Sequence, residues 1–173
     1  MLTTEADRES CQLFRDTSQT MLMRPLHCDF RRAIDALPIH LNSLVAESEM
    51  EGFQFLRRLV TDWSDGTNTF SLDGEALFLA EHEGRLVGVA GLNIDPYAGS
   101  SHIGRVRRLY VSKRFRRHGV GSRLLAEIVA AAKNRFTRLQ LFTRSADAVR
   151  FYVALGFVAR EDIPQCTHVL DLD

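Results

Sequence analysis

The stretch LYVSKRFRRHGVGSRLL, residues 109–125, decides the fold, because a strand ends in it and a helix begins in it. Residues 103–111 have the composition of a strand, and the apolar residues from Val120 to Ala132 recur with the period of a helix. Gly119 and Gly121 lie at the junction. A glycine turn of this kind leaves backbone N–H groups pointing outward at the positive end of the helix dipole, so the stretch predicts an anion-binding site.

Other interpretations of the glycine turn are weaker. A dinucleotide-binding fingerprint needs a third glycine where Leu124 stands, and a P-loop needs Gly-Lys-Ser or Gly-Lys-Thr after the turn. Between Asp95 and Glu127 the chain has no acid and many arginines, a patch that could follow a phosphate backbone. It lacks the interleaved aromatic residues of single-strand binders, and the pI is near 7.0. A helix start with a solvated basic face stays open as an alternative.

The composition indicates one globular domain: the chain has 173 residues, of which 45% are hydrophobic and 25% charged. We expect an N-terminal extension over residues 1–24 and one domain over residues 25–173. The formal net charge of +0 gives no global attraction to nucleic acid or anionic lipid. The three cysteines lack metal-site spacing, so no metal is expected. No secretory leader or membrane span is evident, which favours a cytoplasmic protein without nucleic-acid or membrane partners.

Hydrophobic periodicity predicts the element order β, α, α, β, β, β, α, β, α, β, β. Antiparallel strands come first and a β-α-β crossover follows. We therefore expect an α/β layered domain with a mixed, mostly antiparallel sheet of about six to seven strands and helices on both faces. The expected elements include a strand from Pro25, helices over residues 37–45 and 53–63 or one helix bent at Gly52, strands on either side of Glu83-Gly84, a strand over 103–111, a helix from 120, a strand over 139–143, a helix over 146–155 and a last strand near 167–172.

Two segments of the chain resemble the GNAT superfamily of N-acetyltransferases. In residues 109–121, an apolar-x-Val strand end is followed by a short basic loop and the pattern Arg-x-x-Gly-x-Gly. The second segment has Ala148, the pair Phe151-Tyr152 and the pair Gly156-Phe157, with a helix and a strand between the two segments. The resemblance covers about residues 26–173. It implies the acyl-CoA N-acyltransferase fold, whose sheet is splayed open at its middle strands to admit the cofactor.

The resemblance also implies which residues bind acetyl-CoA. Backbone N–H groups of the glycine turn would hold the pyrophosphate, and the edge of strand residues 109–111 would pair with the pantetheine arm. A backbone N–H near Leu109 or Tyr110 would face the thioester carbonyl. The implied cofactor-binding residues are Leu109, Tyr110, Val111, Arg116, Arg117, His118, Gly119, Val120, Gly121, Ser122, Ser145 and Tyr152.

Tyr152 is the implied catalytic residue. A phenol with a pKa near 10 can give its proton to a leaving thiolate whose thiol has a pKa near 8.5. The alternative is a packing role, since Ala148, Tyr152 and Leu155 share one helix face. No cysteine lies in the matched segments, which favours direct transfer in a ternary complex over a covalent enzyme intermediate.

Two residues depart from the family pattern. Ser145 stands where many members have asparagine, although serine can still cap the following helix. Arg105 occupies the place of a glutamate that often acts as general base, and an arginine cannot accept the proton of the amine at neutral pH. With Arg107 on the same strand face it could clamp an acceptor carboxylate, or merely display charge. Candidate bases are Asp95, Glu49, Glu51 and His102, although the sequence around each is more typical of a surface or turn residue.

The resulting prediction is an acetyl-CoA-dependent N-acetyltransferase that acts on the primary amine of a small molecule, with or without a carboxylate on that molecule. Protein N-termini or lysine side chains stay open as acceptors, and so does a non-catalytic coenzyme A-binding or regulatory domain that has lost its base. Superfamily members often dimerise, so a homodimer is also left open. The predicted acceptor contacts are Arg105, Arg107, Asp95 and Glu51.

Overall fold

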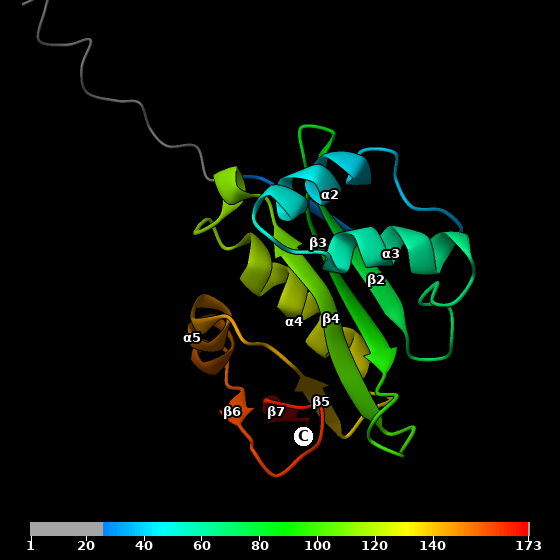
Figure 1. Cartoon of the computed structure of the whole chain (residues 1–173), viewed down its shortest axis with the longest axis vertical. Coiled ribbons are helices and arrows are strands. Elements are labelled where there is room, and N and C mark those ends of the chain that lie inside the picture. Colours follow the sequence, from blue (N-terminus) through cyan, green and yellow to red (C-terminus); the bar gives the residue numbers. More distant parts are fainter. Residues whose placement is uncertain (1–25, 173) are drawn as a thin grey trace, which may run out of the picture.

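The computed structural model describes residues 26–172 of the chain (Figure 1). The predicted N-terminal extension, residues 1–24, lies outside the described residues. The order of helices and strands is the predicted one, with one additional short 3-10 helix, Lys113–Phe115, between the fourth strand and the helix of the glycine turn.

One seven-stranded sheet forms the centre of the molecule, in the order β1-β2-β3-β4-β5-β7-β6. Within the described residues β4 and β5 are the only parallel neighbours, because α4 crosses over between them, and every other pair is antiparallel. The predicted mixed, mostly antiparallel sheet is confirmed. Its strands are β1 (Asp29–Arg32), β2 (Ala76–His82), β3 (Arg85–Ile94), β4 (Ile103–Val111), β5 (Arg138–Leu141), β6 (Val158–Ala159) and β7 (His168–Asp171).

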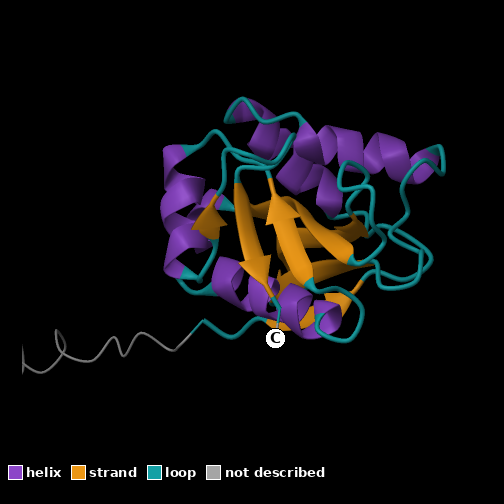
Figure 2. Cartoon of the chain, turned by 90° about the horizontal axis from the view of Figure 1, so that it is seen from below, coloured by secondary structure: helices purple, strands orange, loops and turns teal. Residues whose placement is uncertain are grey.

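Helices cover both faces of this sheet (Figure 2). On one face lie α2 (Leu41–Met50) and α3 (Phe55–Ser64), and on the other lie α4 (Val120–Ala132) and α5 (Ala146–Ala154). Alternate residues of β2 point into the two cores, so the run ALFLA is buried throughout. The uniformly apolar sequence of this strand follows from having a helix layer on each side.

The sheet opens between β4 and β5. Only Ile103, Gly104 and Arg105 of β4 pair with β5, which leaves the β4 edge without a strand partner from Val106 onward among the described residues. Beyond Arg105, this edge of β4 faces α5 and the start of α4 across the opening, where a neighbouring strand would otherwise lie (Figure 1). The opening therefore exposes backbone and side chains in the middle of the fold.

The helix predicted over residues 53–63 begins later, at Phe55. Gly52 adopts a left-handed φ of 84°, which turns the chain sharply after α2 and leaves Phe53 in the turn. Phe53 is therefore partly exposed instead of packing with the helical stripe. The first strand also begins later than predicted, at Asp29.

Candidate active site

A single cleft of about 1060 Å³ occupies the opening between β4 and β5. It lies between β4, the start of α4, α5 and the turn that joins α2 to α3. Ten of the twelve predicted cofactor-binding residues line it, His118 and Val120 being the two that do not. Three of the four predicted acceptor contacts also line it, and the fourth, Asp95, does not.

The glycine turn presents free N–H groups at the start of α4. Arg117 and Gly119 adopt left-handed φ values of 66° and 80°, and no described side chain caps the helix. The first intrahelical bond runs from the Arg123 N–H to the Gly119 carbonyl at 3.0 Å, so the N–H groups of residues 120–122 have no intrahelical acceptor. The backbone here has the arrangement that binds a phosphate.

We expect Gly119→Ala to raise the KM for acetyl-CoA roughly 10-fold or more, because a methyl group at the turn would keep a phosphate from its donors. A Cβ at this position meets no described atom within 4 Å, so nothing in the protein itself excludes it. The left-handed φ alone costs about 1–2 kcal/mol.

Gly66→Ala is the matched control for this prediction, because Gly66 has a similar φ of 77° and equally open space, but lies outside the cleft. Both variants should lose similar stability on thermal melting, and only Gly119→Ala should change steady-state kinetics. An unchanged KM for acetyl-CoA in Gly119→Ala would contradict pyrophosphate binding at this turn.

A β-bulge deforms β4 in the middle of the cleft wall. Val89 pairs with Tyr110 and Gly91 with Arg107, so Arg108 and Leu109 together face one residue of β3. Arg108 has a left-handed φ of 58°, which is unusual for a residue with a side chain. A bulge leaves backbone groups outside the ladder and redirects them, which frees donors beside the predicted thioester position.

The side chain of Arg108 is bound on the α3 side of the bulge. Its Nη2 donates to Asp62 Oδ2 at 2.8 Å, and the side chain is almost fully buried. Burial, the charge of Arg107 and that of Arg58 lower the pKa of Arg108 to about 10, against the attraction of Asp62. Sequence reasoning missed this bulge, because the residue with the positive φ is Arg108 and not a glycine.

Arg116 binds protein rather than presenting a free charge at the rim. Its guanidinium donates to both carboxylate oxygens of Glu51 at 2.8 and 2.9 Å, and its Nε donates to the Val111 carbonyl at 2.9 Å. The predicted contact between this guanidinium and a coenzyme phosphate would require it to leave these partners. Arg117, which is exposed and lines the cleft, has no carboxylate partner among residues 26–172.

Two glutamates of the α2 end tie this helix to the cleft wall. Tyr110 donates its hydroxyl to Glu47 and Glu51 at 3.1 and 3.0 Å. Glu47 also accepts from the Ser112 hydroxyl and the Lys113 N–H. Arg116 is the largest cause of the lowered pKa of Glu51, which makes that carboxylate a weak base. Glu47 was not predicted, because its partners come from a distant part of the sequence.

The Tyr152 ring packs edge-on against the rings of Phe151 and Phe157 in the core. Its hydroxyl has no hydrogen-bond partner among the described residues, and burial raises its pKa well above the ordinary value. The phenol is therefore protonated at neutral pH. The ring packs in the core, as the packing alternative predicts, and the residue also lines the cleft, where its role as general acid stays a prediction.

The other predicted cofactor residues differ in their surroundings. Ser145 caps α5, accepting a hydrogen bond from the Ala148 N–H at 3.4 Å. Leu109 and Val111 pack against the α4-side core, so contacts with a ligand from this part of β4 fall to the strand backbone. His118 is exposed, with its Nδ1 at 2.8 Å from the Arg116 carbonyl.

Arg105 lies on β4, and its side chain forms a buried ion pair. Its Nη1 donates to Asp95 Oδ2 at 3.0 Å, and its Nη2 donates to the Gln165 carbonyl at 2.7 Å. The side chain of Asp95 is 0% exposed and also accepts from the Tyr97 N–H. The guanidinium of Arg105 stacks over the Tyr97 ring at 4.9 Å. Asp95 therefore offers no carboxylate to the cleft.

Of the four candidate bases, only Glu51 lines the cleft. Glu49 pairs with Arg57 on the surface, and His102 is exposed in the turn before β4. The chain therefore places no carboxylate with a raised pKa in the part of the cleft that the structure describes. Phe53, Phe55 and Tyr97, which sequence reasoning also missed, line the cleft, with Phe53 beside Phe55 and Tyr97 stacked on the Arg105 guanidinium.

An open α/β sheet with a phosphate-type turn at one end of its cleft and a buried phenol in its wall is the architecture of an acyltransferase. The acetyltransferase (GNAT) family matches residues 41–157 of the chain. The chain therefore belongs to the GNAT acetyltransferase family, whose acetyl donor is acetyl-CoA.

Solved structures agree with this assignment. A proposed acetyltransferase of Exiguobacterium sp. 255-15 is 32% identical, with a TM-score of 0.75 over 84% of this chain and 93% of that one. A GNAT acetyltransferase of Staphylococcus aureus Mu50 is 18% identical, with a TM-score of 0.69 over 85% of this chain and 100% of that one. YncA of Salmonella typhimurium, solved with acetyl-CoA, shares the fold at 16% identity and a TM-score of 0.60, over 84% of this chain and 94% of that one.

Two further predictions concern ligands and location. Among residues 26–172, no group of three or more histidine, cysteine, aspartate or glutamate side chains is placed to hold a metal ion. No helix in that range has the length and apolar character needed to cross a membrane. The cytoplasmic location and the homodimer stay predictions.

Proposed function

We propose that the protein transfers the acetyl group of acetyl-CoA to the primary amine of a small molecule, by direct attack in a ternary complex. The observation that carries this proposal is the protonated phenol of Tyr152 in the wall of the same cleft that holds the uncapped start of α4. The cleft volume of about 1060 Å³ suits a cofactor arm and a small acceptor, since small-molecule sites measure about 300–1,000 Å³.

In the proposed reaction the amine nitrogen attacks the thioester carbonyl carbon, and the carbon–sulfur bond breaks as the carbon–nitrogen bond forms. The sulfur takes the phenol proton of Tyr152, and the proton that the attacking nitrogen loses returns to the Tyr152 phenolate, directly or through water. Backbone N–H groups at the bulge of β4 stabilise the negative charge on the carbonyl oxygen. No cysteine of residues 26–172 lines the cleft, which supports direct transfer over an acetyl-enzyme intermediate.

The acceptor amine must lose its proton without a strong protein base. Arg105 holds the place of the usual glutamate, and Arg116 lowers the pKa of Glu51. We therefore propose that the amine binds neutral, or gives its proton to water. Its own pKa then governs the reaction rate.

A pH profile tests this step. Below the pKa of the acceptor, kcat/KM for the amine should rise about tenfold per pH unit, because the neutral fraction of an amine rises by that factor. Glu51→Gln should keep this slope, since its carboxylate is not the base. A plateau in wild-type kcat/KM that begins near pH 6–7 with an amine of pKa near 10 would instead reveal a protein base.

The function itself is tested by following release of the coenzyme A thiol with a panel of primary amines. We expect release that depends on both substrates, N-acetylated product in equal amount, and intersecting initial-rate lines typical of a ternary complex. Parallel lines would point to an acetyl-enzyme intermediate. Tight binding of acetyl-CoA with no turnover on any amine, peptide N-terminus or lysine would favour the non-catalytic alternative.

A further inference from the structure

We propose that the acceptor amine carries a carboxylate and that Arg107 binds it. This inference rests on the proposed N-acetyltransferase function, because it names the class of acceptor for the same cleft. It assigns to Arg107 alone the role that sequence reasoning divided between Arg105 and Arg107.

The first argument is the charge of the cleft. Six arginines and two acids line it. Four of the six arginines have carboxylate partners: Arg105 with Asp95, Arg108 with Asp62, Arg116 with Glu51 and Arg150 with Asp147. Within the described residues, Arg107 and Arg117 have none. Arg117 stands in the glycine turn, so Arg107 is the unpaired arginine in the rest of the described cleft.

The second argument is the surroundings of Arg107. It is partly buried on β4, directly before the bulge, and its charge is one cause of the lowered pKa of Arg108. Among the described residues, Asp62 is the only carboxylate paired with either Arg107 or Arg108, and it binds Arg108. A carboxylate brought by a ligand would offset this positive excess, and the guanidinium fork matches the two oxygens of a carboxylate.

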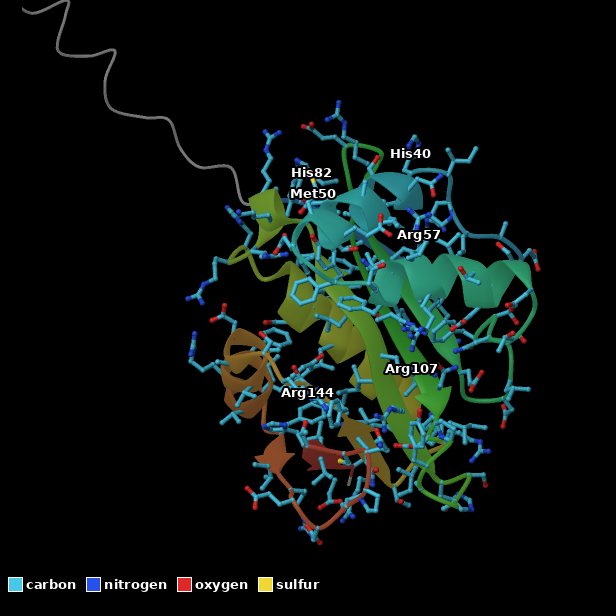
Figure 3. The ribbon with its side chains drawn as sticks, in the orientation of Figure 1. His40, Met50, Arg57, His82, Arg107 and Arg144 are labelled. Atoms are coloured by element: carbon cyan, nitrogen blue, oxygen red, sulfur yellow. The ribbon has the colours of Figure 1, made fainter. Side chains whose placement is uncertain are left out.

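The third argument is what Arg105 cannot do. Its two terminal nitrogens already donate to Asp95 and Gln165, and its side chain is 8% exposed. Binding a second carboxylate would bring a further negative charge beside the buried Asp95. The acceptor carboxylate is therefore left to Arg107, whose place on β4 is labelled in Figure 3.

Aromatic side chains of the same cleft indicate the rest of the acceptor. Phe53, Phe55 and Tyr97 line the cleft, and Phe53 and Tyr97 are exposed enough to contact a ligand. Aromatic faces favour an apolar or aromatic body. The acceptor class is thus a small amino carboxylate with a hydrophobic body, such as an apolar amino acid.

The test compares matched compounds that differ only at the carboxylate: phenylalanine, phenylalaninamide and phenethylamine, with leucine and leucinamide as a second set. In the wild type, kcat/KM should be roughly 10- to 100-fold higher for the acid than for its amide at equal concentration of neutral amine. Arg107→Gln should abolish this preference and leave the KM for acetyl-CoA unchanged. Arg107→Lys should restore part of it, since lysine keeps the charge without the fork.

Arg144→Gln is the control. Arg144 lies in the segment between β5 and α5, stacks over the Phe142 ring and does not line the cleft (Figure 3). Arg144→Gln removes the same charge as Arg107→Gln, so a general electrostatic effect would lower the ratio of kcat/KM for the acid to kcat/KM for the amide in both variants. Loss confined to Arg107→Gln indicates direct contact, and equal loss in both would overturn the proposal.

A binding measurement separates this inference from the proposed function. With coenzyme A present, N-acetylphenylalanine should raise the Tm more than N-acetylphenylalaninamide, and Arg107→Gln should remove that difference. This result would support the carboxylate site even if no amine were acetylated. Turnover of amines with no preference for the acid, or a preference unchanged in Arg107→Gln, would overturn the inference and leave the acetyltransferase function standing.

Discussion

Tyr152→Phe should lower kcat for acetyl transfer by about 10²- to 10⁴-fold, the range typical of a lost general acid. The KM for acetyl-CoA should change little, because the substitution removes one oxygen and keeps the ring. The hydroxyl binds no described residue, and the edge-on contacts with Phe151 and Phe157 belong to the ring. The Tm should therefore stay within a few degrees of the wild type.

Substrates with different leaving groups make this prediction sharper. An acetyl thioester whose thiol has a low pKa, such as an acetylated nitrothiophenol, needs no proton on its sulfur as it leaves. The defect of Tyr152→Phe should shrink with such a donor. If the variant kept full activity with acetyl-CoA, Tyr152 would be a packing residue only.

Asp95→Ala should destabilise the fold by about 3–5 kcal/mol, the usual cost of leaving a buried charge without its partner. It removes the carboxylate that accepts from the Arg105 guanidinium and from the Tyr97 N–H. For a domain of this size the Tm should fall by roughly 6–20 °C. Thermal and urea melts measure both quantities.

The exposed pair of Asp73 and Arg135 provides the control, because Asp73 is 93% exposed. Asp73→Ala should change stability by less than about 1 kcal/mol. The double variant Asp95→Leu/Arg105→Met should be more stable than Asp95→Ala, since it leaves no buried charge without a partner. Equal losses for Asp95→Ala and Asp73→Ala would show that the buried pair does not stabilise the fold.

Local sequence was sufficient for the order of the elements and for the glycine turn at the start of α4. The 3.6-residue period of α4 and the glycines before it are short-range signals, and the structure places the turn where they predict it. The same holds for the hairpin at Glu83-Gly84, where both residues adopt positive φ. The start of α3 was misplaced, because the spacing of Phe53 fits a helical stripe whether or not the backbone there is helical.

The acceptor side could not be predicted in the same way. The partners of its charged groups are distant in sequence: Glu51 meets Arg116, Asp62 meets Arg108, and the Gln165 carbonyl meets Arg105. These distant partners decide which arginine forms an ion pair and which has no carboxylate partner among the described residues. Period-two spacing placed Arg105 and Arg107 on one strand face but could not distinguish them.

By itself, the sequence determined the family, the order of the elements and the position of the phosphate-type turn, because each depends on residues adjacent along the chain. Only the tertiary structure decided the state of the charges in the cleft. Where α2, α3 and the segment before β7 meet β4, the strand bulges at Arg108, Arg116 pairs with Glu51, and Arg107 has no carboxylate partner among residues 26–172. Burial and ion pairing depend on such long-range contacts, which local patterns do not encode.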